Sequence, residues 1–267
     1  KTFLDVRART LNEFRMLLSK GKAISRSTFS EELKQRSFLT NSLNVFRKHP
    51  FLRLDDEQIL MLDVQFVAEL LTFGVYWSIY DALPKVRRGA FKQLWGRMFE
   101  LYIVNLLADF YPPMSRMLSA DIEYSNGQID ALIDFGGYVL VFEIKSSLLT
   151  EPAKRNANKE SFLTDFRRKF VENERGKPKA IKQLATACCA ILAGEIETAK
   201  VRESPVIYPI FVSDEPTVEA TFMNAFFHQE FQRDGITNTK VKPLTVMSVD
   251  ELEQTLSYVT NNDFSWE

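Results

Sequence analysis

Two neighbouring segments of the chain, residues 129–135 and 138–144, have the pattern of hydrophobic positions expected of β-strands. Both are rich in β-branched and aromatic residues, and Gly136 and Gly137 between them are typical of a two-residue hairpin turn. The second segment is a nearly continuous apolar run, which indicates a strand covered by protein on both faces. The pattern therefore predicts an antiparallel hairpin.

The turn also determines which polar residues of the two strands meet. If Gly136 and Gly137 form the whole loop, Asp130 lies opposite Glu143, and strand alternation puts Lys145 on the same face as Glu143. Two carboxylates that face each other are destabilising unless a cation joins them. Two interpretations follow: a buried site that needs partners or a metal, or the solvated face of an edge hairpin.

A long segment with the pattern of an α-helix precedes the hairpin. Residues 91–110 carry hydrophobic residues at helical spacing for about five turns. Arg97 and Glu100 lie on one side of this helix, and Leu107 lies on the same side two turns later. Beyond Glu100 the helix is therefore expected to be apolar nearly all round and buried. Glu100 then lies at the boundary of the core. The alternative is a surface ion pair between Arg97 and Glu100.

A second helix is predicted after the hairpin, over residues 177–196. Pro178 is placed to open it, and an apolar stripe runs along one of its sides. Lys179, Lys182 and Gln183 lie on or beside the other face. Gln183 therefore either faces a site or is simply a solvated helix residue.

The remaining segments complete a mixed α/β pattern. Further strands are expected at residues 121–124, 205–213 and 242–248. Ser248, with Glu251 three residues later, has the pattern of a capping box, which predicts a helix after the last strand. The order along the chain predicts an α/β fold with a mixed central sheet flanked by helices.

Residues 1–85 are expected to form a separate, mainly helical accessory region, and residues 86–267 the α/β domain. The accessory region includes an amphipathic helix at residues 1–20 and a short hairpin at residues 51–62. The aromatic residues of a further predicted helix, residues 64–83, are more typical of a core than of a base-stacking platform. Nothing in this region indicates a chemistry.

Composition limits the class of protein. The 267 residues are 45% hydrophobic and 26% charged, with a formal net charge of −1, as in a soluble globular protein. Since no apolar run could span a bilayer and no secretory signal is found, we expect a cytoplasmic protein without membrane contact. Cys188 and Cys189 are adjacent, which favours reduced core thiols over a disulfide. A chain that begins with Lys1 is expected to be processed or a fragment.

Positive charge gathers after the hairpin. Residues 151–182 hold ten basic and five acidic residues. Arg167, Arg168 and Lys169 lie in this segment, within a short stretch that carries Phe at helical spacing. Such a segment can hold a nucleic-acid backbone, whereas the alternative is a solvated loop.

Asp130, twelve intervening residues and then Glu143-Ile144-Lys145 resemble the motif of the PD-(D/E)XK nuclease superfamily. The resemblance covers the chain from residue 91 to about residue 256. It implies a restriction-endonuclease-like core.

Two helical residues add to the resemblance. The sequence around Glu100 resembles the first core helix of that superfamily, in which a Glu often approaches the metal site. Gln183 resembles the helix Gln of its exonuclease and resolvase branches, although Ala187 stands where a Tyr commonly follows. That departure leaves the branch open.

The resemblance implies metal-dependent hydrolysis of phosphodiester bonds, by an endonuclease or an exonuclease. The implied ligands of Mg²⁺ or Mn²⁺ are Asp130, Glu143, the carbonyl of Ile144 and Glu100. Lys145 would orient or activate the attacking water and help to neutralise charge on the phosphate. Gln183 is a further implied site residue.

The resemblance implies DNA more than RNA as the partner, and a role in restriction, defence or repair. The predicted contacts to nucleic acid are Arg167, Arg168, Lys169, Lys179 and Lys182. The chain is also expected to form a homo-oligomer or to join a larger defence or repair complex. Two alternatives from other classes are a non-catalytic nucleic-acid-binding or scaffold domain that retains the fold, and a purely structural interaction domain.

Overall fold

The chain forms two compact units, Lys1–Phe91 and Lys92–Glu267, and the boundary between them lies inside helix α6 (Arg88–Phe110). The computed structural model describes residues 23–35, 44–54, 58–71, 73–111, 117–150, 153–154, 158–196, 205–233 and 238–261. The helix predicted at residues 1–20 lies outside the described residues.

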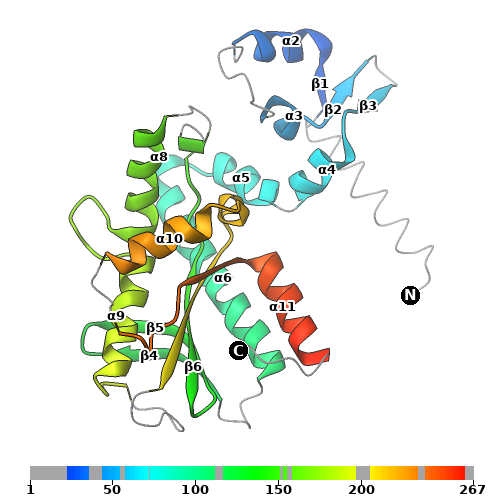
Figure 1. Cartoon of the computed structure of the whole chain (residues 1–267). Helices are drawn as coiled ribbons and strands as arrows, with labels where there is room; N and C mark the ends of the chain where they lie inside the picture. Colours follow the sequence, from blue (N-terminus) through cyan, green and yellow to red (C-terminus); the bar gives the residue numbers. More distant parts are fainter. Residues whose placement is uncertain are drawn as a thin grey trace. The chain divides into compact units, whose positions relative to one another are not determined.

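The first unit contains a small three-stranded sheet and short helices (Figure 1). Strand β2 (Phe51–Arg53) pairs antiparallel with β3 (Ile59–Met61), which confirms the predicted hairpin, and parallel with β1 (Ala23–Ser25). The helical elements are α2 (Arg26–Gln35), α3 (Asn44–Lys48), α4 (Val64–Leu71), α5 (Phe73–Ala82) and the 3-10 turn η2 (Lys85–Arg87). The single helix expected over residues 64–83 is thus represented by α4 and α5.

The second unit is built on a five-stranded mixed sheet in the order β4-β5-β6-β7-β8. Its antiparallel part is β4 (Leu118–Tyr124), β5 (Gly127–Asp134) and β6 (Tyr138–Lys145); its parallel part is β6, β7 (Val206–Ser213) and β8 (Thr245–Ser248). Besides α6, the helical elements are α8 (Lys159–Phe166), the π-helical η4 (Arg167–Val171), α9 (Ala180–Leu192), η5 (Pro216–Glu219), α10 (Met223–Gln232) and α11 (Val249–Asn261). The mixed α/β architecture is confirmed, whereas α10 was not predicted.

The β5–β6 hairpin has the predicted register. Ala131 pairs with Phe142, and the amide of Phe135 donates to the carbonyl of Tyr138 at 3.0 Å, which closes a two-residue loop. Gly136 in this loop has a φ of 86°, a conformation that residues with a Cβ rarely adopt. The turn therefore requires glycine at this position and fixes the register of the pairs from Asp134↔Val139 to Ala131↔Phe142.

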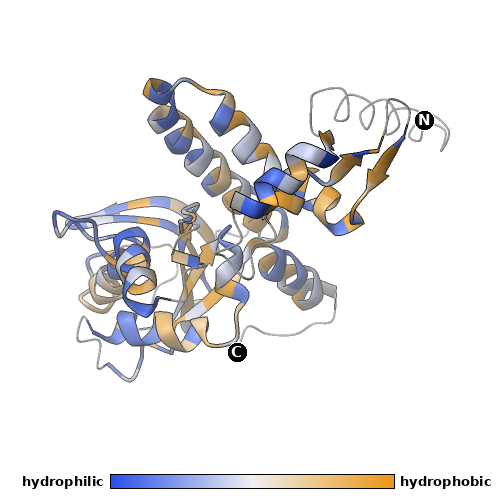
Figure 2. Ribbon diagram, turned by 90° about the horizontal axis from the view of Figure 1, so that it is seen from above, coloured by the Kyte–Doolittle hydropathy of each residue, from blue (hydrophilic) through white to orange (hydrophobic). Residues whose placement is uncertain are grey.

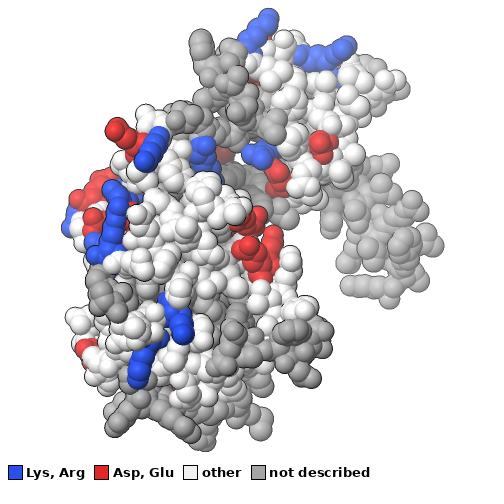
Figure 3. All heavy atoms as spheres, viewed as in Figure 1, with Lys and Arg blue, Asp and Glu red and all other residues white. Residues whose placement is uncertain are grey.

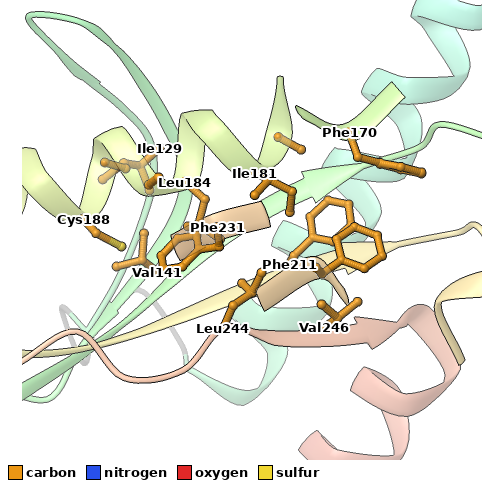
Figure 4. Close-up of a cluster of buried hydrophobic side chains, with 14 of the residues drawn as sticks. Ile129, Val141, Phe170, Ile181, Leu184, Cys188, Phe211, Phe231, Leu244 and Val246 are labelled. Carbon is orange, nitrogen blue, oxygen red and sulfur yellow. The ribbon is translucent and has the colours of Figure 1, made fainter. Parts of the chain in front are cut away.

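The residues of β6 alternate between two hydrophobic clusters, one on each face of the sheet. Val139 and Val141 pack in the cluster formed with α9 and α10, shown in Figure 4, and Leu140 and Phe142 pack in the cluster formed with α6 and α11. All four side chains are buried, so β6 is covered on both faces, as its continuous apolar run indicates. In Figure 2 the surrounding helices carry both hydrophobic and hydrophilic residues, as expected of helices that pack with one side.

The expected burial of α6 is corrected by the structure. Ile103 and Leu107 are buried against the sheet, but Leu101 is 53% and Tyr102 is 47% exposed. An apolar helix can thus face the core with a single stripe, and the sequence pattern alone does not show which stripe that is.

Other expectations about burial hold only in part. Cys188 is buried, as predicted, but Cys189 is exposed, and both thiols are free. Tyr76 is buried, whereas the neighbouring Trp77 is 46% exposed. Among the helices of the described residues, none is long and apolar enough to cross a membrane.

Ser248 caps α11 in the predicted manner. Its Oγ accepts the amide of Glu251 at 3.2 Å, and its own amide donates to the Glu251 carboxylate at 2.8 Å. We expect Ser248→Ala to lower the free energy of unfolding by about 1 kcal/mol, because an amide in the first turn loses its acceptor. Denaturant titration measures this change, and Glu251→Gln, which keeps an acceptor oxygen, is the control. An equal loss in both variants would contradict the assignment.

Candidate functional site

Asp130 lies where β5 leaves its ladder with β6. The paired residues end at Ala131↔Phe142, and just beyond, the amide of Ile144 donates to Oδ2 of Asp130 at 2.7 Å. In a continued antiparallel ladder this amide would bond to the carbonyl of Ile129. Ile129 is instead buried in the cluster with α9, so β5 bends toward α9 (Figure 1) and the Asp130 carboxylate replaces the backbone partner.

Glu143 is a buried carboxylate beside Asp130. It is only 5% exposed and makes no hydrogen bond with a described residue. Burial raises the pKa of Glu143 well above its usual range, the charge of Asp130 raises it further, and Lys145 opposes both effects. Burial likewise raises the pKa of Asp130 to about 6, although the Ile144 amide opposes the shift. Two carboxylates therefore share a poorly hydrated space in which negative charge is costly.

Lys145 ends β6 and lies on the same face of the strand as Glu143. Its charge lowers the pKa of both Asp130 and Glu143, so its ammonium group acts on both carboxylates. Across the parallel ladder, the hydroxyl of Ser213 donates to the Lys145 carbonyl at 3.0 Å. The backbone of Lys145 is thus fixed by the centre of the sheet.

The segment that follows Lys145 is held by buried carboxylates. The amide of Leu149 donates to Glu215 and the amide of Thr150 donates to Asp165, both at 2.7 Å. Glu215 is fully buried. These bonds fix the chain just beyond the site.

Glu100 has features of both interpretations, a residue near the site and a partner in an ion pair with Arg97. It forms the predicted ion pair with Arg97, with 2.5 Å between Nη1 and Oε1. Yet its charge raises the pKa of Asp130 and of Glu143, so α6 does bring it close to the carboxylate pair. Arg97 also contacts Asp121, at 3.4 Å. Glu100 is therefore beside the site but engaged by a guanidinium.

Helix α9 covers the face of the sheet that carries Glu143. Lys179 is the N-cap of α9, and its pKa is lowered by burial and by the charges of Lys145 and Lys177. Three lysines therefore approach one another at this end of the helix. Gln183, one turn further, is half-buried and its side chain makes no hydrogen bond with a described residue. Its place in the site stays a prediction.

Three of the predicted nucleic-acid contacts are held in ion pairs. The pairs are Arg167 with Glu230 (3.2 Å), Arg168 with Asp165 (2.6 Å) and Lys182 with Glu172 (2.5 Å). Lys169 is half-buried, and burial lowers its pKa. Figure 3 shows basic and acidic side chains side by side near the loop between η4 and α9. A phosphate would have to compete with carboxylates for these groups.

The structure adds residues that the sequence reasoning missed. Asp121 lies between the pairs Ala120↔Ala131 and Ile122↔Ile129, which places it level with Asp130. Extending the pairing back from the turn at residues 125–126 would have found it.

Tyr124 and Lys177 have no comparable signal in the sequence. The pKa of Tyr124 is raised to about 12, mainly by burial and also by the charge of Glu143, so its neutral hydroxyl group lies near that carboxylate. Lys177 is identified as a neighbour of the site only because its charge lowers the pKa of Lys179.

A divalent cation would fit the carboxylate pair. Among the described residues, no group of three or more His, Cys, Asp or Glu side chains is arranged to hold a metal ion. Mg²⁺, however, is commonly held by one or two carboxylates, with waters and substrate phosphates completing its shell. The observation that favours a cation is the buried Glu143 carboxylate, which lies beside Asp130 and has no hydrogen bond from the residues that the structure describes.

Comparisons of the chain with protein-family models, with curated proteins and with solved structures found no match. The function is therefore inferred from the geometry of these residues.

Proposed function

We propose that the chain is a metal-dependent nuclease that hydrolyses phosphodiester bonds, in DNA more than in RNA. The observation that carries this proposal is the buried pair Asp130 and Glu143, with Lys145 acting on both carboxylates. A protein that only bound nucleic acid would gain nothing from two adjacent carboxylates, because they repel phosphate.

The topology supports a restriction-endonuclease-like core. Helix α6 precedes the antiparallel strands β4, β5 and β6, and α9 then connects β6 to the parallel strand β7. The motif residues lie where β5 and β6 separate. By its resemblance to the superfamily, such a nuclease would serve in restriction, defence or repair.

Each residue of the proposed site would have a definite role. Asp130, Glu143 and the carbonyl of Ile144 would hold Mg²⁺ or Mn²⁺, with Glu100 as a further ligand. When bound, the metal would polarise the phosphate and lower the pKa of a bound water. Lys145 would hold the attacking water and neutralise charge that develops on the phosphate.

Lys177 and Lys179 are better candidates for the proposed DNA contacts than Arg167 and Arg168. Neither ammonium group forms an ion pair with a carboxylate of the described residues, whereas Arg167 and Arg168 each do. The charges of Lys145 and Lys177 both lower the pKa of Lys179, so the three ammonium groups lie near one another. A phosphate near Lys145 could therefore be held by this group of lysines.

We expect the double variant Lys177→Gln, Lys179→Gln to reduce the salt dependence of DNA binding. Each phosphate contact that the variant removes should reduce the slope of log affinity against log salt by about 0.9, because fewer counterions are released. Binding to unrelated sequences should weaken equally, since phosphate contacts carry no base information. Fluorescence anisotropy at several salt concentrations measures the slope.

The matched control is Arg167→Gln with Arg168→Gln, which also removes two positive charges. Its slope should remain near that of the parent, because both arginines are paired with carboxylates. A larger decrease in this control than in the lysine variant would return the DNA contact to the arginines of η4.

A cleavage assay tests the function itself. The purified protein is incubated with Mg²⁺, Mn²⁺ or a chelator and with single-stranded, duplex and branched DNA and RNA. We expect cleavage of DNA with metal and none with chelator. Binding without cleavage under every condition would favour the non-catalytic alternative.

A further inference from the structure

Arg97 joins carboxylates from two different elements. From α6, its guanidinium contacts Glu100 on the same helix at 2.5 Å and Asp121 on β4 at 3.4 Å. Asp121 also accepts a hydrogen bond from the Gln128 side chain at 2.7 Å. The Arg97 side chain is 59% exposed, so it can change its partner without displacing the core.

Asp121 has an unusual backbone conformation. It is the one non-glycine residue of the described chain with a positive φ, 52°. Such conformations are strained and persist only where surrounding contacts hold them. Here the side chain is held by Arg97 and Gln128, and it lies level with Asp130 in the β4–β5 pairing. Arg97 thus has a second carboxylate available beside the first.

The charges around Asp130 are not balanced. The charges of Glu100 and Asp121 both raise the pKa of Asp130, and Glu100 also raises that of Glu143. When these four carboxylates are ionised, Arg97 and Lys145 neutralise two of them, which leaves two negative charges. A divalent cation would supply the remaining balance. It would also compete directly with Arg97 for the Glu100 carboxylate.

We propose that Arg97 is a positioning residue that holds Glu100 together with Asp121 while the metal is absent, and that releases Glu100 and keeps Asp121 when the metal binds. The inference rests on the proposed metal site at Asp130 and Glu143. In the metal-free protein, Arg97 acts as the internal cation of this acidic group. Metal binding then frees Glu100 toward the ion, and Asp121 retains the guanidinium near the site.

The test is a double-mutant cycle for Mn²⁺ binding, measured by calorimetry on the full chain. Arg97→Gln should tighten Mn²⁺ binding by about tenfold, within the usual range for coupled sites, because the competitor for Glu100 is removed. In the Glu100→Gln background the same change should have little effect. Thermal melting with chelator verifies that each variant is folded.

The outcomes separate this inference from the proposed function. Tightening of the same size in both backgrounds would mean a general effect of charge and would overturn the proposed release of Glu100. Unchanged or weaker binding in Arg97→Gln would also overturn it, while leaving the metal site intact. If the parent chain binds no Mn²⁺, both the inference and the proposed function fail.

Discussion

Replacing Lys145 with Ala is expected to reduce cleavage by at least about a hundredfold at saturating DNA and metal, while the protein remains folded. The reason is its position. Lys145 is the cation that acts on both Asp130 and Glu143, and its backbone is fixed by the β6–β7 ladder. Loss of its charge would also raise the pKa of both carboxylates further, so the metal must be titrated to saturation before turnover is compared.

Single-turnover rates with duplex DNA measure this effect. Lys159→Ala is a matched control, since it removes an exposed lysine from the first turn of α8. The control should cleave at nearly the rate of the parent. If folded Lys145→Ala protein cleaves at the parent rate, Lys145 has no part in the chemistry, and another cation near the pair, with Lys179 the first candidate, would have to be examined.

The hairpin could be predicted because its information is local. A two-glycine turn fixes the register, and strand alternation then places Glu143 and Lys145 on one face. The capping box of Ser248 is equally local. The bend of β5 at Asp130 could not be predicted, because it depends on the packing of Ile129 against α9, a contact between elements distant in sequence.

The electrostatic surroundings of the site were also beyond the sequence pattern. Arg97 and Glu100 are only three positions apart, and their ion pair was one of the two interpretations of the sequence, but the contact of Arg97 with Asp121 spans 24 positions. The arginines of η4 were predicted as DNA contacts from local charge alone. Their carboxylate partners include Glu230 of α10, a helix that was not predicted. Charge along a sequence therefore shows where cations gather but not which of them are neutralised.

The double change Asp130→Asn with Glu143→Gln is expected to abolish the rise in Tm that Mg²⁺ or Mn²⁺ gives the parent, because a ligand that binds only the folded chain stabilises it by mass action. Both substitutions keep the size of the side chain, and the Asn oxygen can still accept from the Ile144 amide. Thermal melting with metal and with chelator measures the difference. A variant that responds to metal as the parent does would place the metal elsewhere.

The same variant should be more stable than the parent when metal is absent and the pH is neutral. Folding raises the pKa of Asp130 from 3.8 to about 6, so ionisation weakens the folded state. This penalty is absent below about pH 4, grows as the pH rises through about 6, and then reaches up to about 3 kcal/mol. The raised pKa of Glu143 adds a penalty of the same sign. Melting curves in chelator should therefore coincide at low pH and diverge toward neutral pH, with the variant higher. A variant that melts below the parent at neutral pH would show that the two carboxylates do not oppose folding.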